Sequence, residues 1–271
     1  MTSPLFAYND IRLGLESIFR SRLQMQILLS LGEGCKTLSD LRTITGSSSQ
    51  AIIPRIRALE KRSFISNQRY QYCLTPLGRI FETKINEITR LFSLLTHHDT
   101  FWHEHYLDGI PEQFINEMSD LCNSQIVADT SVEIFQVYAH YQAVIENARR
   151  IHWVSSMISP GHLHYIITRV MDGVPVEMII TAEVDRQLRA EPYASQVSQM
   201  KTCSNYIQYI SDNPLKFGLM VTDTQFILGL YKQDMTTFDA SSHFTSSDSQ
   251  ALSWGERVLT HFRSTARACS L

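Results

Sequence analysis

The chain has 271 residues, of which 44% are hydrophobic and 10% aromatic, enough apolar material for one large domain or two modest ones. No apolar run approaches the roughly 20 residues that a membrane-spanning helix needs, and the start, MTSPLFAYND, lacks the basic and apolar regions of a signal peptide. The 5 cysteines are odd in number and form no CxxC pair, so neither a disulfide framework nor a structural zinc site is indicated. We therefore expect a cytoplasmic protein with reduced thiols.

The net charge of −3 conceals a division along the chain. Residues 1–96 carry 13 Lys and Arg against 7 Asp and Glu, whereas the remaining residues carry 11 against 20. A basic module joined to an acidic one fits a chain whose first part meets a polyanion. Chance asymmetry of surface composition is the alternative.

Three helices and a hairpin are expected in the basic part. An amphipathic helix is predicted over residues 21–31, and a short helix between its capping residue Thr37 and Gly46. The third helix lies in SSSQAIIPRIRALEKRSFI, residues 47–65, and residues 64–74 contain two β-prone runs around a turn. This order is typical of a winged helix-turn-helix.

Pro54 stands inside the predicted third helix. At about 100° per residue it falls opposite the apolar stripe, on the same side as Arg57 and Lys61. Near the helix start, water can satisfy the carbonyl of Gln50 that loses its donor, so the cost should lie well below the roughly 3 kcal/mol of a mid-helix proline. Alternatively, the helix begins later and Pro54 lies in its first turn.

The candidate DNA-binding residues lie on the third helix, at its N-terminal tip and in the hairpin. Basic side chains neutralise phosphates, and hydroxyl and backbone N–H groups at a helix tip bind them. A solvated charged face is the alternative, but the helix order and the basic charge favour DNA binding. The predicted contacts are Ser47, Ser48, Ser49, Gln50, Arg55, Arg57, Lys61, Arg62 and Arg69.

A long helix is predicted from Thr75, where the chain reads TPLGRIFETKINEITRLFSLL with apolar residues at near-heptad spacing. It has more apolar surface than a hairpin can cover. Either a second copy of the chain or the following domain covers it. Paired DNA-binding modules bind two half-sites, which favours a homodimer.

The segment HHDTFWHEHYLDGIPE, residues 97–112, is rich in histidine and aromatic residues. On a helix, Asp99 and His103 would face the same way, as metal ligands can. No HExxH-like pair or second cluster accompanies them, so we expect an interdomain joint and no metal.

Beyond it, the pattern is that of an α/β domain. Two strands, at 151–157 and 174–181, are each followed by a helix; three β-rich runs fill residues 204–232, and a helix over 249–267 closes the chain. The expected fold class is α+β or α/β. The expected divisions are residues 1–95, a winged helix-turn-helix for DNA binding and dimerisation; residues 96–124, a connector; and residues 125–271, an α/β effector-sensing domain.

Several passages together resemble archaeal transcriptional regulators of methanogens that combine a winged helix with a methanogenesis regulatory protein middle domain. They are IPRIRALEK, YQYCLTPLGR, FWHEHYLDGIPE, ARRIHWVSSMISPGH and WGERVLTHFR, and they span essentially the whole chain. The resemblance implies an effector-responsive, dimeric transcription factor. The second half also resembles the phospholipase-D-like effector domains of archaeal sugar-responsive regulators. Catalysis of that kind needs His-x-Lys, and none of the 10 histidines has Lys two positions later.

A small effector is expected at the carboxyl ends of the first two strands of the α/β domain, where loop and helix N–H groups converge. Small donors and acceptors there suit a polar metabolite or an anion. Ser and Thr at strand ends also cap helices, which is the structural alternative. The candidate effector-binding residues are Ser155, Ser156, Ser159, His162, Thr181 and Glu183.

Two rival classes of function stay open. An enzyme with a winged-helix dimerisation module, such as a methyltransferase, would show a glycine-rich turn after its first strand, but neither GxGxxG nor GxxxxGK[ST] occurs. We therefore expect neither catalysis nor a cofactor. A redox or metal sensor that uses Cys203 or the histidine-rich segment is the other rival.

Overall fold

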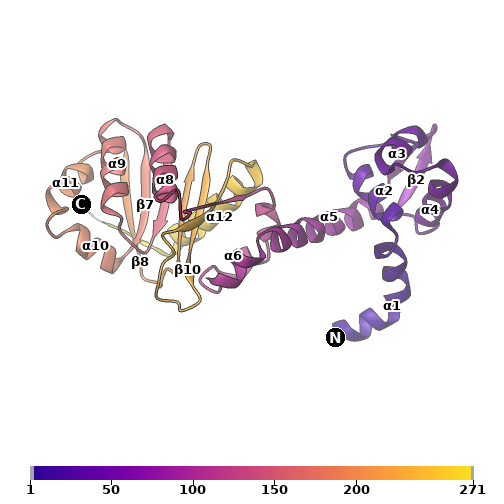
Figure 1. Cartoon of the computed structure of the whole chain (residues 1–271), viewed down its shortest axis with the longest axis horizontal. Helices are drawn as coiled ribbons and strands as arrows, with labels where there is room; N and C mark the ends of the chain where they lie inside the picture. The colour runs from indigo at the N-terminus through magenta and orange to yellow at the C-terminus, as the bar shows by residue number, and fades with distance from the viewer. Residues whose placement is uncertain (1–2, 270–271) are drawn as a thin grey trace. The chain divides into compact units, whose positions relative to one another are not determined.

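The computed structural model describes residues 3–269 (Figure 1). Internal contacts divide the chain into two compact units, one that extends to Thr89 and one that begins at Arg90. We call them the winged-helix unit and the α/β unit; the helix α5 (Pro76–His97) begins in the first and ends in the second. Within residues 3–269, no helix is long and apolar enough to cross a membrane.

The winged-helix unit contains the three expected helices and the expected hairpin, so the prediction of a winged helix-turn-helix is confirmed. A helix at the start and a short strand before the second expected helix were not predicted. The elements are α1 (Pro4–Phe19), α2 (Arg22–Gly32), β1 (Lys36–Thr37), α3 (Leu38–Thr45), α4 (Ser49–Lys61), β2 (Ile65–Gln68) and β3 (Gln71–Leu74). The three strands form an antiparallel sheet in the order β1-β3-β2.

Local signals explain the boundaries of these helices. Thr37 and Asp40 form a capping box at the start of α3, and Gly46 ends that helix at φ 63°, a conformation that costs glycine little. Ser48 caps α4 by accepting a hydrogen bond from the backbone N–H of Ala51. Each helix then buries one apolar face in a shared core, formed chiefly by Ile27, Leu28, Leu41, Ile52, Ile56 and Leu59.

Pro54 lies in the second turn of α4, five residues after its first residue Ser49, and its side chain is exposed. The prediction of an outward-facing proline inside the helix is confirmed, and the alternative of a later helix start is wrong. Ser48 fixes the start of the helix before Pro54 is reached.

One sequence-based expectation about the cysteines is wrong. Cys35 and Cys73 form a disulfide in the winged-helix unit, with 4.4 Å between their Cα atoms. The pairing of β1 with β3 aligns Lys36 with Tyr72, so Cys35 and Cys73 are the next residues along the two strands. A separation of 38 residues in sequence gave no local signal of this contact.

The α/β unit is built on a mixed sheet of nine strands (Figure 1). The strands β6, β7 and β8 are parallel to one another, as the expected helix crossovers require, and the other pairings are antiparallel. The order is β12-β8-β7-β6-β9-β10-β11-β5, with β4 also paired to β10. Their bounds are β4 (His105–Tyr106), β5 (Gln125–Ala128), β6 (Ile151–Ser155), β7 (Val176–Thr181), β8 (Tyr206–Ser211), β9 (Phe217–Thr222), β10 (Phe226–Lys232), β11 (Ser242–Ser246) and β12 (Arg267–Ala268).

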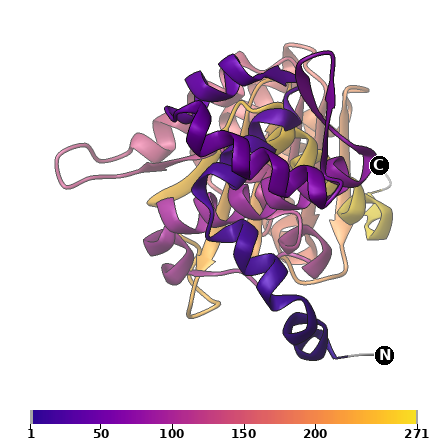
Figure 2. The same cartoon turned by 90° about the vertical axis from the view of Figure 1, so that its right-hand side faces the viewer.

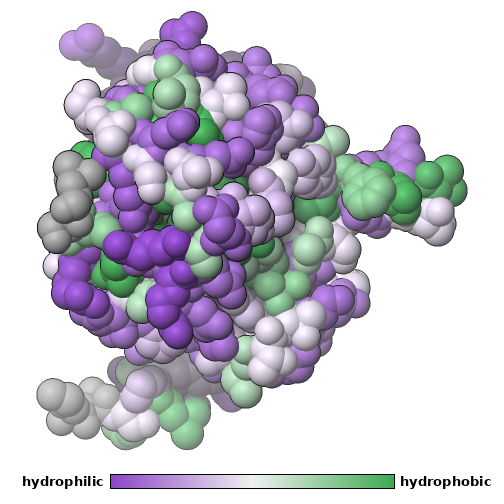
Figure 3. Space-filling model, turned by 90° about the vertical axis from the view of Figure 1, so that its left-hand side faces the viewer, coloured by the Kyte–Doolittle hydropathy of each residue, from purple (hydrophilic) through white to green (hydrophobic). Residues whose placement is uncertain are grey.

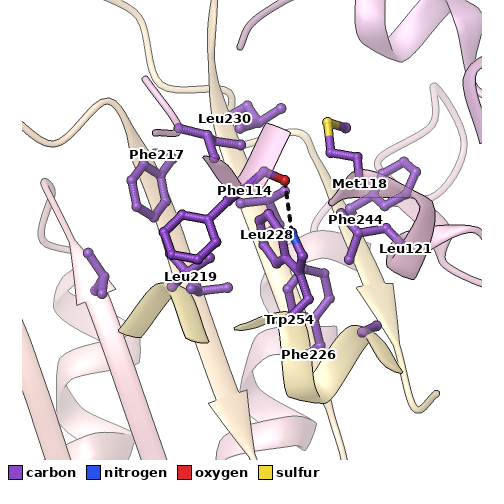
Figure 4. Packing of buried hydrophobic residues seen from close by; sticks show 14 of the residues in the cluster. Phe114, Met118, Leu121, Phe217, Leu219, Phe226, Leu228, Leu230, Phe244 and Trp254 are labelled. Carbon is purple, nitrogen blue, oxygen red and sulfur yellow. Dashed lines mark hydrogen bonds between the residues drawn. The ribbon is translucent and has the colours of Figure 1, made fainter. Parts of the chain in front are cut away.

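Helices cover both faces of this sheet, because alternate residues of the central strands are apolar on each side. One face packs against α8 (Gln136–Asn147), α9 (Pro160–Met171), α10 (Ala182–Leu188) and α11 (Ala194–Lys201). The other face packs against α12 (Ser249–Thr265). On that side Trp254 lies beside Phe226, and its indole Nε1 donates a hydrogen bond to the carbonyl of Phe114 at 3.0 Å (Figure 4).

The segment 96–124 folds as part of the α/β unit. It forms α6 (Asp99–Glu104), β4, α7 (Glu112–Ile115) and the 3₁₀ turn η1 (Met118–Leu121), and its apolar side chains enter the same core as Trp254. The indole of Trp102 donates a hydrogen bond to the carbonyl of Leu94 near the end of α5. The structure therefore divides the chain at Thr89, and the finer divisions at 95 and 124 stay predictions.

Four strands of this sheet were not predicted, and two of them, β4 and β12, are only two residues long. β11 lies in the polar stretch ASSHFTSSDSQ, and β5 precedes α8. Their sequences lack the continuous apolar runs of β7 or β10, because they lie at the end of the sheet order.

Candidate functional site

The outer face of α4 is basic and exposed. Gln50, Arg55, Arg57 and Lys61 are all exposed there, because the opposite face of the helix is buried in the core. Within residues 3–269, none of these cations forms an ion pair. Unpaired cations on one helix face can bind phosphates without breaking internal contacts.

Other residues of the predicted DNA-binding set have partners inside the unit. The side chain of Ser48 accepts the cap bond from Ala51, and the hydroxyl of Ser47 donates to the carbonyl of Thr45 at 3.3 Å. Arg62 extends toward α1, where its Nη2 donates to the hydroxyl of Ser17 at 3.5 Å. Ser49 is half-buried as the first residue of α4.

Arg69 lies at the tip of the β2–β3 hairpin. Arg69 and Tyr70 form its two-residue turn with φ of 50° and 68°, as the twist of a tight hairpin requires. Tyr70 is 90% exposed at this tip and was missed by the sequence reasoning, which considered only basic side chains, serines and Gln50. Exposed aromatic and basic groups at a wing tip can contact a nucleic-acid backbone or groove.

A cavity of about 500 Å³ opens in the α/β unit at the carboxyl end of β6. We call it the aromatic cavity. Its walls come from α8, the start of α9 and the loop between β10 and β11. The lining residues are Asp129, Phe135, Val137, Tyr138, Tyr141, Trp153, Ser155, Met157, Ser159, His162, Gly218, Lys232, Thr237, Phe238, Asp239, Ala240, Ser241 and Ser242.

Three of the predicted effector-binding residues line this cavity. Ser155 ends β6 and donates a hydrogen bond to the carbonyl of Met157 at 2.8 Å. Ser159 is the N-cap residue of α9, but its side chain makes no capping hydrogen bond. His162 lies in the first turn of α9, and its Nε2 is buried without a hydrogen-bond partner.

The other three predicted residues lie outside the cavity. The hydroxyl of Ser156 is bonded to that of Tyr231 at 2.8 Å. Thr181 caps α10 by accepting from the N–H of Val184, as the structural alternative expected, and Glu183 is exposed in the first turn of that helix. The cavity opens toward β9 and β10, whereas β7 lies on the other side of β6.

Three histidines and two tyrosines form a cluster at one wall of the cavity. The ring of His162 lies 4.7 Å from that of Tyr138 and 4.9 Å from that of Tyr141. Nε2 of His243 is 2.9 Å from Nδ1 of His140, so one of these two rings donates to the other. Burial lowers the pKa of all three histidines, and the nearby His140 and His162 help lower that of His243 to about 3. The three histidines are therefore uncharged at neutral pH.

Asp239, in the loop that forms another wall, is tied to His105 of β4. The carboxylate accepts from Nε2 of His105 at 3.0 Å, and both side chains are buried. Nδ1 of His105 is 2.7 Å from the carbonyl of Phe101, which can only accept. Burial would raise the pKa of Asp239, but hydrogen bonds from His105, Ser241 and Ser242 outweigh it and lower the pKa far below its ordinary value.

Phe238 closes the sheet side of the cavity. Gly218 and Gly229 are paired across β9 and β10, and Phe238 lies over both of them. A Cβ at Gly229 would come within 2.6 Å of the Phe238 ring, so a side chain there would displace it. The sequence reasoning missed this wall because the glycine pair is formed by strand register.

No cluster of metal ligands occurs in the part of the chain that the structure describes. In the histidine-rich segment, Nδ1 of His97 contacts the carbonyl of Ser93, and Nδ1 of His103 that of Asp99. Cys203 lies beside Met171, with 3.9 Å between their sulfur atoms.

Both units match models of known protein families. Residues 13–95 match the family described as "Methanogenesis regulatory protein FilR1, N-terminal domain", and residues 134–265 match "Methanogenesis regulatory protein FilR1, middle domain". A curated relative, methanogenesis regulatory protein FilR1 of Methanothrix harundinacea (strain 6Ac), is 22% identical over 250 residues. That match covers 91% of this chain and 56% of the relative, so the chain spans about half of the relative's length.

Two solved structures resemble the chain at lower sequence identity than this relative. TrmBL2, an archaeal chromatin protein, matches with a TM-score of 0.43 and 14% identity over 96% of this chain and 100% of that one. Nuc, a phospholipase D family member from Salmonella typhimurium, matches with a TM-score of 0.41 and 13% identity over 55% of this chain and 99% of that one. The family matches cover both units, and on that ground the chain belongs to the family of methanogenesis regulatory proteins defined by the FilR1 N-terminal and middle domains.

Proposed function

We propose that this protein is a DNA-binding transcriptional regulator whose α/β unit binds a small effector in the aromatic cavity, and that it is not an enzyme. The observation that supports DNA binding is the exposed face of α4, where Arg55, Arg57 and Lys61 have no carboxylate partner among the described residues. A second helix of a helix-turn-helix enters the major groove with its N-terminal part.

A homodimer is part of this proposal. α5 leaves five apolar side chains exposed at 41–73%, whereas Phe81 stacks on Phe64 and Ile85 is buried. The predicted apolar stripe of this helix therefore divides into an inner part, which packs in its own unit, and an outer part, which suits a second copy. The outer residues are Leu77, Ile80, Ile88, Phe92 and Leu95.

The effector part of the proposal is supported by the cavity itself. Its volume of about 500 Å³ falls in the range of small-molecule sites. The His105–Asp239 bond links its wall to α6 and β4, and Trp102 of α6 is bonded to the last turns of α5. We propose that an effector changes DNA binding through this chain of contacts into α5.

The test is selection of genomic DNA fragments by the full-length protein, followed by affinity measurements over a range of salt concentrations. The expected result is enrichment of a defined set of sequences and an affinity that falls steeply with salt, because phosphate contacts release counterions. Equal recovery of all fragments with an affinity that does not depend on salt would contradict the proposal.

A second candidate function is a redox-responsive regulator, and the Cys35–Cys73 disulfide favours it. The bond joins β1, which leads into α3, to β3 of the hairpin. Reduction would free these two segments of the DNA-binding unit from each other. DNA affinity of the Cys35→Ser, Cys73→Ser double variant equal to that of oxidised wild-type protein would exclude this role.

A further inference from the structure

We infer that the aromatic cavity takes an aromatic, largely apolar small molecule that carries one acidic group. This inference rests on the proposed effector function and specifies the chemistry of its ligand. The sequence-based expectation was a polar metabolite or an anion. The acidic group agrees with the second of these, whereas the aromatic, apolar character is new, because the walls contributed by α8 and by the β10–β11 loop were not predicted.

The lining is suited to an aromatic body. Rings reach the cavity from four places: Phe135 before α8, Tyr138 and Tyr141 on α8, Trp153 on β6, and Phe238 on the loop after β10. Rings that stack or meet edge to face add to the energy of apolar burial. A highly hydrated ligand would find fewer free partners, because the hydroxyls of Ser155, Ser241 and Ser242 already donate hydrogen bonds within the protein.

The carboxylates of the lining are already stabilised by hydrogen-bond donors inside the protein. The carboxylate of Asp239 accepts hydrogen bonds from His105, from the backbone and hydroxyl of Ser241, and from the hydroxyl of Ser242. The carboxylate of Asp129 accepts from the backbone N–H of Val137 at the start of α8. Both carboxylates are thus held by donors within the protein, and a cationic ligand would have to compete with those donors.

The positive groups, in contrast, are not compensated. Lys232, the last residue of β10, lines the cavity and forms no ion pair among residues 3–269. At the start of α9 the side chain of Ser159 makes no cap bond, so this end of a 12-residue helix keeps its partial positive charge. The neutral histidine cluster adds hydrogen-bonding capacity through the unpartnered Nε2 of His162. A ligand with a single carboxylate, sulfonate or phosphate complements this arrangement.

The experiment measures fluorescence titrations of the full chain at pH 7 with three aromatic probes. They are anionic 8-anilinonaphthalene-1-sulfonate, neutral N-phenyl-1-naphthylamine and cationic thioflavin T. We expect the anionic probe to bind several-fold more tightly than the neutral one and the cationic probe not to bind. Energy transfer from Trp153, which lines the cavity, should accompany binding.

Two variants with matched controls locate the probe. Lys232→Gln should weaken binding of the anionic probe about five- to tenfold and change the affinity for the neutral probe by less than twofold. The control is Lys216→Gln, which should change neither affinity; the ammonium of Lys216 lies over the Tyr231 ring. Ala240→Trp places a large side chain in an exposed part of the lining and should weaken both probes more than tenfold. Ala182→Trp, at an exposed position outside the lining, should weaken neither. Melting temperatures check that each variant is folded.

The outcomes separate this inference from the proposed function. Equal affinity for the anionic and neutral probes, unchanged by Lys232→Gln, would overturn the inference that the ligand carries an acidic group. Probe binding that Ala240→Trp does not weaken, or no binding by any probe, would overturn the inference that the cavity takes an aromatic ligand. Neither result touches DNA binding. Conversely, an absence of salt-dependent DNA binding would overturn the proposed regulator while the probe results stand.

Discussion

The two units place their charged groups in opposite ways. The winged-helix unit holds Arg55, Arg57 and Lys61 on its surface, outside an apolar core. The α/β unit buries ionisable groups, among them His105, Asp239 and His243, within hydrogen-bond networks. Surface charge can bind a polyanion without being part of what stabilises the fold, whereas a buried polar network serves folding and ligand binding together.

Figure 3 shows part of the surface of the α/β unit. A loop with apolar side chains projects from a surface on which hydrophilic and hydrophobic residues alternate (Figure 3). The same loop stands out from the sheet in Figure 2. It joins β5 to α8, and Val132, Ile134 and Phe135 are 65–88% exposed in it. Because Phe135 also lines the aromatic cavity, this loop joins the interior site to the surface.

The largest effect is expected from breaking the buried pair in the α/β unit. Asp239→Ala leaves His105 buried without its partner, and we expect a loss of about 3–5 kcal/mol in the free energy of unfolding. Denaturant unfolding followed by tryptophan fluorescence measures it, since Trp102, Trp153 and Trp254 all belong to this unit. Asp108→Ala, at an exposed position, is the matched control. A loss below about 1 kcal/mol would mean that the pair contributes little.

The next effect is a pH dependence that comes from His243. Its pKa is lowered to about 3, so between pH 6.5 and about 3 the unfolded chain binds a proton that the folded chain does not. Stability is therefore complete above pH 6.5 and falls with decreasing pH by about 1.4 kcal/mol per unit. At pH 5 the loss is about 2 kcal/mol, to which His140 and His162 add in the same direction.

His243→Phe tests this origin, because it keeps a ring against Tyr141 and removes the titrating group. Unfolding free energies at pH 7 and pH 5 should then differ less than in the wild type. His164→Phe, at an exposed position, is the control and should keep the wild-type difference. The same pH dependence in His243→Phe and wild type would place its origin elsewhere.

The exposed apolar stripe of α5, the helix that both units share, predicts a homodimer. Ile88→Glu or Phe92→Glu places a charge on the exposed outer stripe, and we expect a monomer at micromolar concentration where the wild type is a dimer. Sedimentation measures it. Thr83→Glu, exposed on the same helix, is the control and should leave the dimer intact. Dissociation in this variant too would argue against a defined stripe.

The DNA-binding residues should behave as surface groups. Arg57→Ala and Lys61→Ala should each weaken DNA binding by about 1 kcal/mol and lower the salt dependence by about one phosphate contact, without changing the melting temperature. Lys84→Ala is the matched control, because that lysine is engaged with Glu87 at 2.7 Å. Unchanged affinity in both α4 variants would reject the groove-facing assignment.

The features that could be predicted from the sequence are those that depend on interactions between residues close together in the chain. The cap at Thr37 and the outward face of Pro54 depend on neighbours within a few residues, and both were predicted. The Cys35–Cys73 bond depends on strand pairing and was missed. For the cavity, the strand-end position of Ser155, Ser159 and His162 was predicted. The walls from α8 and from residues 237–242 were not, because β10 and β11 bring them to β6 only through the sheet order.

The smallest effect is expected at Pro54, where the winged-helix unit breaks a rule of helix formation on its exposed side. Pro54→Ala restores an N–H donor for the carbonyl of Gln50, which favours the folded state, and it frees the unfolded chain, which disfavours it by about 0.4–1 kcal/mol. Because Pro54 is exposed and buries no core group, we expect a net change between zero and about 1 kcal/mol of stabilisation. Denaturant unfolding followed by circular dichroism measures it, and Ala51→Gly, exposed in the same helix, should destabilise by about 1 kcal/mol as a reference. A loss of several kcal/mol in Pro54→Ala would show that the proline packs against the unit and that α4 presents a different face to DNA.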